Sequence, residues 1–313
     1  MPERRNYIVR QCMDQSKYES DRSKNCLIES SISDHVKNEP CWLGIDEAGR
    51  GPVLGPMVYG TCYSPISDKE RFSDLKFADS KVLSEEQRES IFSKMNESLD
   101  ILGWMVEILS PAYISKSMLR RYKYNLNALS HDCAIGLIKR VLERGVNVTE
   151  VYVDTVGDPT KYQTKLKEIF PNIDVTVSKK ADSLFPIVSA ASICAKVARD
   201  QAVKNWVFME QISLEEPDYG SGYPGDPKTK KFLEQSFDKV FGFPSFVRFS
   251  WSTASLIMDK DGVAVRWEDD DEDDASSQGT PALSHFFKKK DSKPELTRHR
   301  FFSHRQLTHV TSI

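Results

Sequence analysis

The sequence has no apolar run that approaches the ~20 residues needed to cross a bilayer, which argues against a membrane protein. Its first ten residues include arginines but no apolar stretch after them, so they do not form a secretory signal. The six cysteines show neither a C-x-x-C pair nor the spacing of zinc ligands. This usage is typical of reduced thiols in an intracellular protein. The histidines show no pairing pattern, and no internal repeat is visible.

A strong net charge is also absent, since the whole chain carries a formal charge of −3. Opposite charges are concentrated near the C-terminus: residues 259–274 hold nine acidic and two basic residues, and residues 275–313 hold seven basic and two acidic ones. The rest of the chain is almost neutral. A polyanion would therefore have to bind through local patches rather than through the overall field.

Composition divides the chain into three parts. Residues 1–40 are polar and have no sustained period, which predicts a mostly disordered extension. Residues 41–258 alternate apolar segments with turn signals and are long enough for a sizeable core. Residues 259–313 form an acidic and then basic tail.

The middle part predicts an α/β fold with a mixed sheet flanked by helices. Strands are expected at 41–47, 53–63 and 101–109, and a capping box at Ser84 predicts a helix behind it. From about Asn125 the pattern becomes helix, strand (150–154), helix (160–169), strand (173–178) and a long helix (184–208), with a further helix expected at 228–241. Ligands of such folds bind beyond the carboxyl ends of the strands. Asp46 and Asp154 each end a predicted strand, so one crevice could collect both.

The segment from Trp42 to Pro52 carries the most specific chemistry. A strand ends in Asp46 and Glu47, and Arg50 follows between Gly49 and Gly51. Neither glycine has a Cβ, so the backbone can turn sharply and approach a ligand closely. An arginine beside two carboxylates suits a phosphate bridged by metal ions. A strand followed by a charged hairpin is the plain alternative for a shorter match.

The run D-E-A-G-R-G-P at 46–52 resembles the ribonuclease HII family, which includes the catalytic subunits of eukaryotic type 2 enzymes. The resemblance continues downstream and covers residues 41–257. Its further motifs are D-S-K at 79–81, V-Y-V-D-T-V-G at 151–157, K-K-A-D at 179–182 and Y-G-S-G-Y-P-G-D-P-K-T at 219–229. The resemblance implies a ribonuclease H-like fold with an added helical C-terminal region.

The resemblance also implies the site residues. Asp46, Glu47, Asp154 and Asp182 match the acids that bind two divalent cations, and oxygen ligands suit Mg²⁺, with Mn²⁺ as a substitute. By position alone, Asp182 is equally well explained as the cap of the long helix.

Four further matches concern the substrate. Gly49, Arg50 and Gly51 match the turn that senses the ribose 2′-hydroxyl, and Tyr223 matches the tyrosine that packs on the ribose. Lys81 resembles a phosphate contact, although an isolated lysine is usually only solvated. Tyr223 alone would be a surface loop tyrosine. The implied reaction is hydrolysis on the 5′ side of ribonucleotides in RNA–DNA hybrids and of single ribonucleotides embedded in duplex DNA.

Two segments of the tail suggest protein partners. Residues Thr280 to Phe287 resemble the peptide that binds the replication sliding clamp, although Thr280 stands where that motif has glutamine. Residues Arg298 to Val310 resemble the element that meets two accessory subunits in a heterotrimer. These expectations describe a nuclear endoribonuclease. The rivals are a type 1-like ribonuclease H that needs a run of ribonucleotides, and a non-catalytic clamp-bound scaffold.

Overall fold

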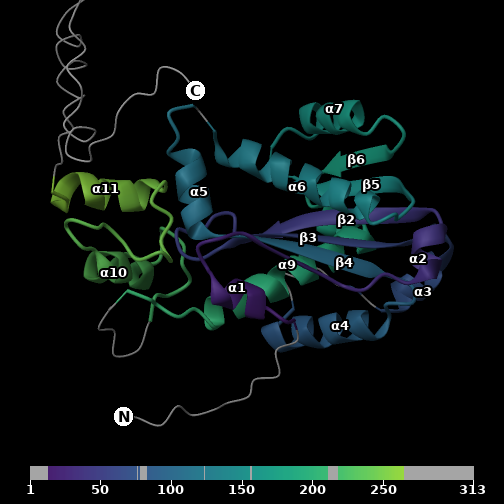
Figure 1. Cartoon of the computed structure of the whole chain (residues 1–313), viewed down its shortest axis with the longest axis horizontal. Coiled ribbons are helices and arrows are strands. Elements are labelled where there is room, and N and C mark those ends of the chain that lie inside the picture. Colours follow the sequence, from purple (N-terminus) through teal and green to yellow (C-terminus); the bar gives the residue numbers. More distant parts are fainter. Residues whose placement is uncertain are drawn as a thin grey trace, which may run out of the picture. The chain divides into compact units, whose positions relative to one another are not determined.

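Six strands form one mixed sheet in the order β1-β4-β3-β2-β5-β6 in a computed structural model, which describes residues 13–75, 77, 83–122, 124–155, 157–210 and 218–263 (Figure 1). The strands are β1 (Cys26–Glu29), β2 (Cys41–Ala48), β3 (Met57–Pro65), β4 (Gly103–Leu109), β5 (Val148–Asp154) and β6 (Asp174–Ser178). Strands β1 to β4 pair antiparallel, whereas β2, β5 and β6 run parallel. The predicted mixed sheet is confirmed.

Helices cover both faces of this sheet. In the described residues they are α1 (Ser16–Ser20), α2 (Asp34–Asn38), the 3₁₀ helix η1 (Ile66–Asp68), α3 (Lys69–Asp74), α4 (Glu85–Glu97), α5 (Pro111–Met118), α6 (Leu126–Glu143), α7 (Pro159–Ile169), α8 (Ala181–Leu184), α9 (Pro186–Lys204), α10 (Pro227–Ser236) and α11 (Ser252–Asp261). Helices α4 and α9 lie on one side of the strands, and α6 and α7 lie on the other (Figure 1). None of the helices that the structure describes could span a bilayer.

Helix α9 packs unusually close to the sheet because both surfaces are small at the contact. Its alanines Ala190, Ala191 and Ala195 are fully buried. A Cβ added to Gly60 on β3 would lie 2.4 Å from the carbonyl oxygen of Ala191. Glycine is thus required there by the approach of the helix backbone. The opposite face of the sheet is more conventional, with larger aliphatic side chains of α6 packed on β2 and β5.

The predicted disorder of residues 1–40 is wrong for residues 13–40. Strand β1 is the edge of the sheet and pairs with β4, with Cys26 opposite Ile108. Tyr18 and Val36 are fully buried, so a few apolar side chains anchor an otherwise polar segment. A composition average hides such anchors, because burial of single large side chains contributes about 1.5–3 kcal/mol each.

Two other boundaries differ from the sequence prediction. The long helix expected at 184–208 is two helices, α8 and α9, separated by an extended Phe185. Proline disfavours helical backbone at the residue before it, and Pro186 follows Phe185. The expected domain boundary at 258 falls inside α11, which continues to Asp261.

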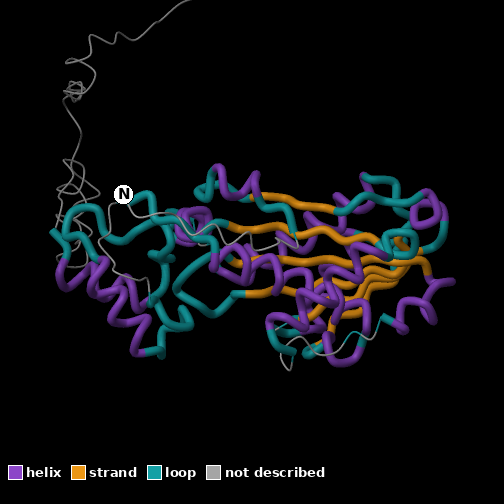
Figure 2. Tube along the Cα trace, turned by 90° about the horizontal axis from the view of Figure 1, so that it is seen from below, coloured by secondary structure: helices purple, strands orange, loops and turns teal. Residues whose placement is uncertain are grey.

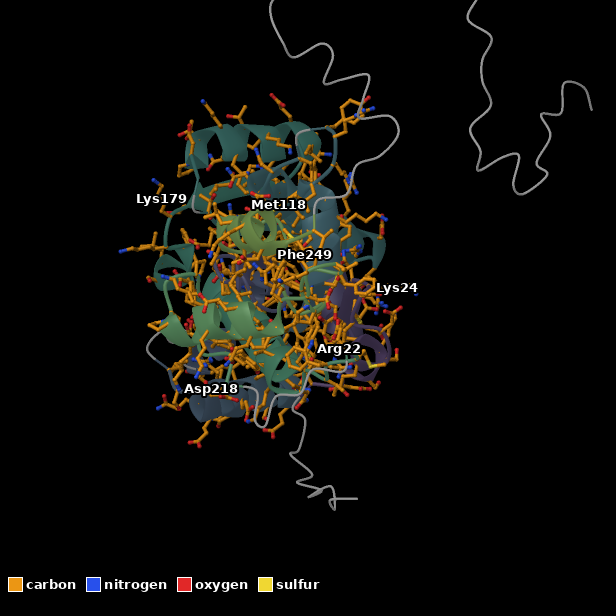
Figure 3. The ribbon with its side chains drawn as sticks, turned by 90° about the vertical axis from the view of Figure 1, so that its left-hand side faces the viewer. Arg22, Lys24, Met118, Lys179, Asp218 and Phe249 are labelled. Carbon is orange, nitrogen blue, oxygen red and sulfur yellow. The ribbon has the colours of Figure 1, made fainter. Side chains whose placement is uncertain are left out.

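The C-terminal helices α10 and α11 lie with long loops beyond one end of the strands (Figure 2). Seen from that end, Met118 of α5 and Phe249 lie next to each other near the middle of the molecule (Figure 3). The Phe249 amide donates a hydrogen bond of 2.9 Å to Ser115 Oγ on α5. The C-terminal segment is therefore fastened across the end of the sheet where β2 and β5 finish.

Candidate active site

The carboxyl ends of the parallel strands β2 and β5 bring the first two predicted acids together. Ile45 pairs with Val153, so Asp46 and Asp154 are the next residues along neighbouring strands. Asp46 is buried, with 5% of its surface exposed, and Glu47 is half-buried beside it. The Glu47 amide donates a hydrogen bond of 2.7 Å to Asp46 Oδ1. The expected crevice at the strand ends is thus present.

Asp182 reaches the same region through the turn after β6. Lys180 adopts a left-handed backbone with φ of 56°, unlike any other non-glycine residue that the structure describes. The chain then reverses, and the Ala181 amide donates a hydrogen bond of 2.7 Å to Asp154 Oδ1. Asp182 is the next residue and is 3% exposed. It caps neither helix, because the N-caps of α8 and α9 are Lys180 and Phe185.

The electrostatics of the site show mutual repulsion. Burial raises the pKa of the Asp46 carboxyl well above its ordinary value, and the charges of Glu47 and Asp154 raise it further. A buried carboxylate next to two others is unfavourable without a cation. Within the residues that the structure describes, no three His, Cys, Asp or Glu side chains already form a metal-binding group. The oxygen-only donors and their repulsion fit a divalent cation, which would draw them together.

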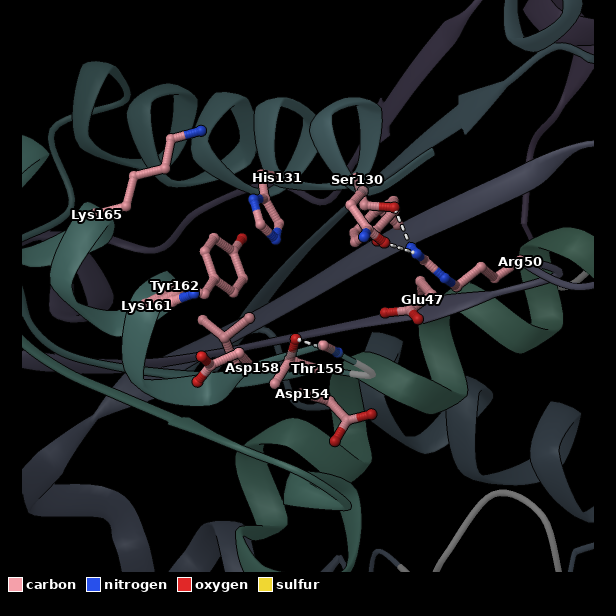
Figure 4. A pocket seen from close by; sticks show the side chains of 14 residues that line it. Glu47, Arg50, Ser130, His131, Asp154, Thr155, Asp158, Lys161, Tyr162 and Lys165 are labelled. Carbon is pink, nitrogen blue, oxygen red and sulfur yellow. Dashed lines mark hydrogen bonds between the residues drawn. The ribbon is translucent and has the colours of Figure 1, made fainter. Parts of the chain in front are cut away.

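The Gly-Arg-Gly turn follows β2 directly. Gly49 has a φ of +78°, and an added Cβ would lie 2.1 Å from Arg199 Nε. The Arg50 guanidinium donates to Ser130 Oγ and Asn127 Oδ1 on α6. Arg50 is therefore directed toward the start of α6 rather than paired with a carboxylate. Its position beside Glu47 is visible in Figure 4.

Tyr223 lies against this turn from the far end of the chain. A Cβ added to Gly51 would lie 2.9 Å from Tyr223 Cε1, so the ring rests on the glycine. The Val53 amide donates a hydrogen bond of 2.8 Å to the carbonyl oxygen of Gly222, which holds the tyrosine loop in place. The ring keeps 53% of its surface exposed. The structure thus joins the two predicted ribose contacts, whereas the predicted phosphate contact Lys81 lies outside the described residues.

A buried arginine, which the motifs of the sequence did not single out, supports the turn. Arg248 is fully buried and donates hydrogen bonds to the carbonyl oxygens of Gly49, Arg50 and Gly55, at 2.6, 3.1 and 2.8 Å. Trp251 Nε1 adds a bond of 3.0 Å to the carbonyl of Gly51. The signal was available, since an arginine inside the apolar run Val247 to Ile257 requires a specific partner.

A cavity of about 300 Å³ opens beside the carboxylates (Figure 4). Glu47, Arg50 and Asp154 line one part of it. The remaining lining comes from α6, α7 and neighbouring residues: Tyr59, Asn127, Ser130, His131, Val153, Thr155, Gly157, Asp158, Lys161, Tyr162 and Lys165. Sequence reasoning assigned His131 no role, yet its ring stacks on Tyr162 with a centroid separation of 3.8 Å.

Comparison with known proteins is consistent with this arrangement. Residues 43–254 match the family model of ribonuclease HII. One of the ribonuclease H2 polypeptides of Bos taurus is 53% identical over 299 residues, which cover 96% of this chain and 99% of that protein.

Two solved structures are also similar. The ribonuclease H2 of Pyrococcus horikoshii OT3 is 34% identical with a TM-score of 0.57, covering 70% of this chain and 98% of that one. The RNase HII in a PCNA:RNase HII complex from Archaeoglobus fulgidus is 31% identical with a TM-score of 0.56, covering 73% and 99%. The chain therefore belongs to the ribonuclease HII family and is a metal-dependent endoribonuclease of the ribonuclease H type.

Proposed function

We propose that this chain hydrolyses the phosphodiester on the 5′ side of ribonucleotides, both in RNA–DNA hybrids and at single ribonucleotides embedded in duplex DNA. Asp46, Glu47, Asp154 and Asp182 are the proposed ligands of two divalent cations, Mg²⁺ or Mn²⁺. The observation that carries this proposal is the placement of Asp46 and Asp154 at the ends of neighbouring parallel strands, next to the Gly-Arg-Gly turn.

Bound cations would supply an activated water and neutralise the charge that develops on the phosphate. The protein's own task is to hold the carboxylates in position. The Glu47 amide fixes Asp46, and the Ala181 amide fixes Asp154. Because a phosphodiester is anionic, it approaches these acids only when cations are present, so ion binding is expected to precede productive substrate binding.

Selection of a ribonucleotide is assigned to the turn and the tyrosine. The backbone of Gly49 to Gly51 is fixed by Arg248 and Trp251, and Tyr223 is fixed against Gly51. A hydroxyl on a rigid ring can hydrogen-bond the ribose 2′-hydroxyl, which DNA lacks. This pairing supports recognition of one ribonucleotide, without need for a longer run.

The chain is proposed to work in a heterotrimer with two accessory subunits. Arg298 to Val310 lies outside the described residues, but an exposed apolar surface lies within them. Val240, Phe241 and Val263 are 69%, 85% and 58% exposed, and the Val263 amide bonds the Lys239 carbonyl. A partner that covers these side chains would remove apolar surface from water. Copurification of both subunits with a chain truncated after Arg298 would contradict a role for the last segment.

Clamp binding and a nuclear location complete the proposal. A related archaeal RNase HII has been solved in complex with PCNA. Thr280 to Phe287 lies outside the described residues, so its role is proposed from its sequence alone. A calorimetric titration of a peptide spanning Gly279 to Lys290 against the clamp tests it, and no heat together with no competition would exclude it. Imaging of a fluorescent fusion tests the location.

Substitution of one acid tests the central proposal. Asp46→Asn should abolish cleavage of a duplex with a single embedded ribonucleotide while duplex binding persists. Asp174→Asn is the matched control, because Asp174 begins β6 at its other end and is exposed. Unchanged turnover of Asp46→Asn would refute the assignment. The same substrate separates the proposal from its rivals: a type 1-like enzyme leaves it intact, and a scaffold without catalysis cleaves neither it nor a hybrid.

A further inference from the structure

The cavity beside the carboxylates has a second, basic end. Helix α7 begins at Pro159, and its residues Lys161 and Lys165 both line the cavity. Four residues apart, they lie on the same face of the helix. In Figure 4 they are on the opposite side of Glu47 from Arg50. The cavity thus has carboxylates in its middle and cations at both ends.

Neither lysine is neutralised by a strong ion pair. Lys165 Nζ lies 3.8 Å from Asp132 Oδ1, and both side chains are about half exposed. Such a pair contributes little. Lys161 has no carboxylate within ion-pair distance among the residues that the structure describes. The remaining acid at this end, Asp158, is engaged as the N-cap of α7 by accepting from the Thr160 amide at 3.0 Å.

The remainder of this end also suits an anion. The first turn of α7 contains no acidic residue, and the start of a helix carries a partial positive charge. The stacked rings of His131 and Tyr162, inclined by only 9°, form a flat wall beside the lysines. A volume of about 300 Å³ has room for a phosphate with its sugar.

We propose that Lys161 and Lys165 bind a backbone phosphate of the cleaved strand on the 5′ side of the bond that is broken. The side of the strand is inferred from the proposed function, on which this inference rests. Tyr223 and Gly51 hold the ribonucleotide, which lies 3′ of that bond. The lysines lie across the carboxylates from that turn, so they meet the strand that becomes the 3′-hydroxyl product.

The test compares lysines on the two faces of α7. Lys161→Gln and Lys165→Gln, alone and together, are assayed for duplex binding and cleavage against Lys167→Gln as the matched control. Lys167 belongs to the same helix but does not line the cavity, and its Nζ lies 3.6 Å from Asp174. The double variant should weaken binding several-fold and lower the salt slope of log Kd by about 1. The control should change neither quantity.

A neutral methylphosphonate placed at one phosphate at a time then locates the contact. With the wild-type chain, one position within two nucleotides 5′ of the scissile bond should weaken binding. The double variant should be indifferent to that position yet remain sensitive to positions on the 3′ side. Equal sensitivity of both proteins at every position, or a shared position on the 3′ side, would overturn the assignment. Wild-type cleavage in the same assay tests the proposed function separately.

Discussion

Arg248 Nη2 donates a hydrogen bond of 2.6 Å to the carbonyl oxygen of Gly49, across almost two hundred residues of sequence. The buried guanidinium bonds three carbonyl oxygens in or next to the catalytic turn and lies 4.8 Å from the Trp251 ring. Shape and hydrogen bonding of the turn therefore depend on a side chain from the C-terminal part of the protein.

Replacement of that arginine should affect both stability and activity. Arg248→Gln leaves buried carbonyl oxygens without donors, each worth about 1 kcal/mol, so the free energy of unfolding should fall by about 3 kcal/mol. Turnover should fall as the turn loosens. Urea unfolding and cleavage kinetics measure the two effects. Arg71→Gln is the control, because its exposed ion pair with Asp100 should contribute less than about 1 kcal/mol. Equal stability of the two variants would contradict the structural role.

Gly49→Ala should damage catalysis more than stability. The left-handed backbone costs an alanine about 1–2 kcal/mol, and the new Cβ must also displace Arg199 and the carbonyl of Pro56. A displaced turn beside the carboxylates can lower turnover by up to about 100-fold.

Gly145→Ala is the matched control for that change. Its φ of +83° imposes the same backbone strain, but nothing lies within 4 Å of the added Cβ. Similar loss of unfolding free energy with unchanged turnover is expected. Equal turnover of the two variants would show that the crowding at Gly49 has no catalytic consequence.

Tyr223→Phe should retain the ring on Gly51 but lose the hydrogen bond to the ribose. Cleavage of a single embedded ribonucleotide should fall about tenfold, the value of one such bond. Single-turnover assays with saturating enzyme measure it. Tyr122→Phe is the control, since that tyrosine is 87% exposed and does not contact the turn. No difference between the two variants would remove Tyr223 from recognition.

Divalent cations should stabilise the free protein. The repulsion that raises the pKa of Asp46 is relieved when a cation binds. At ten times its dissociation constant, an ion that binds only the folded chain adds about 1.4 kcal/mol. Calorimetry with and without Mg²⁺ should show the increase for the wild type and for Asp174→Asn. Asp182→Asn should lose most of it, and full retention would exclude Asp182 as a ligand.

Stability should fall in mild acid partly because of His131. Burial, with the charges of Lys165 and Arg50, lowers the pKa of His131 below its ordinary 6.5. The unfolded chain then takes up the proton first, so unfolding free energy is lost as pH falls below about 6.5 and the loss levels off below the folded-state pKa. Urea unfolding across this range should show a weaker pH dependence for His131→Gln than for the wild type. Parallel curves would contradict the shift.

The sequence by itself determined much of the scaffold and the identity of the acids. Strand β2, the capping box of α4 and helix α6 follow from local periodicity and capping, which act between residues close in sequence. Asp46 and Asp154 were predictable because each acid ends an apolar strand. The motifs around Gly49 and Tyr223 identified the family without any knowledge of their contact.

Only the tertiary structure decided what holds these residues together. The edge strand β1, the ring of Tyr223 on Gly51, the support of the turn by Arg248 and the basic end of the cavity join segments distant in sequence. Local propensity carries no information on such pairs, because their energy comes from packing and hydrogen bonds that form only when the whole chain is folded. The same reason explains why residues 13–40 look disordered in sequence and are ordered in the fold.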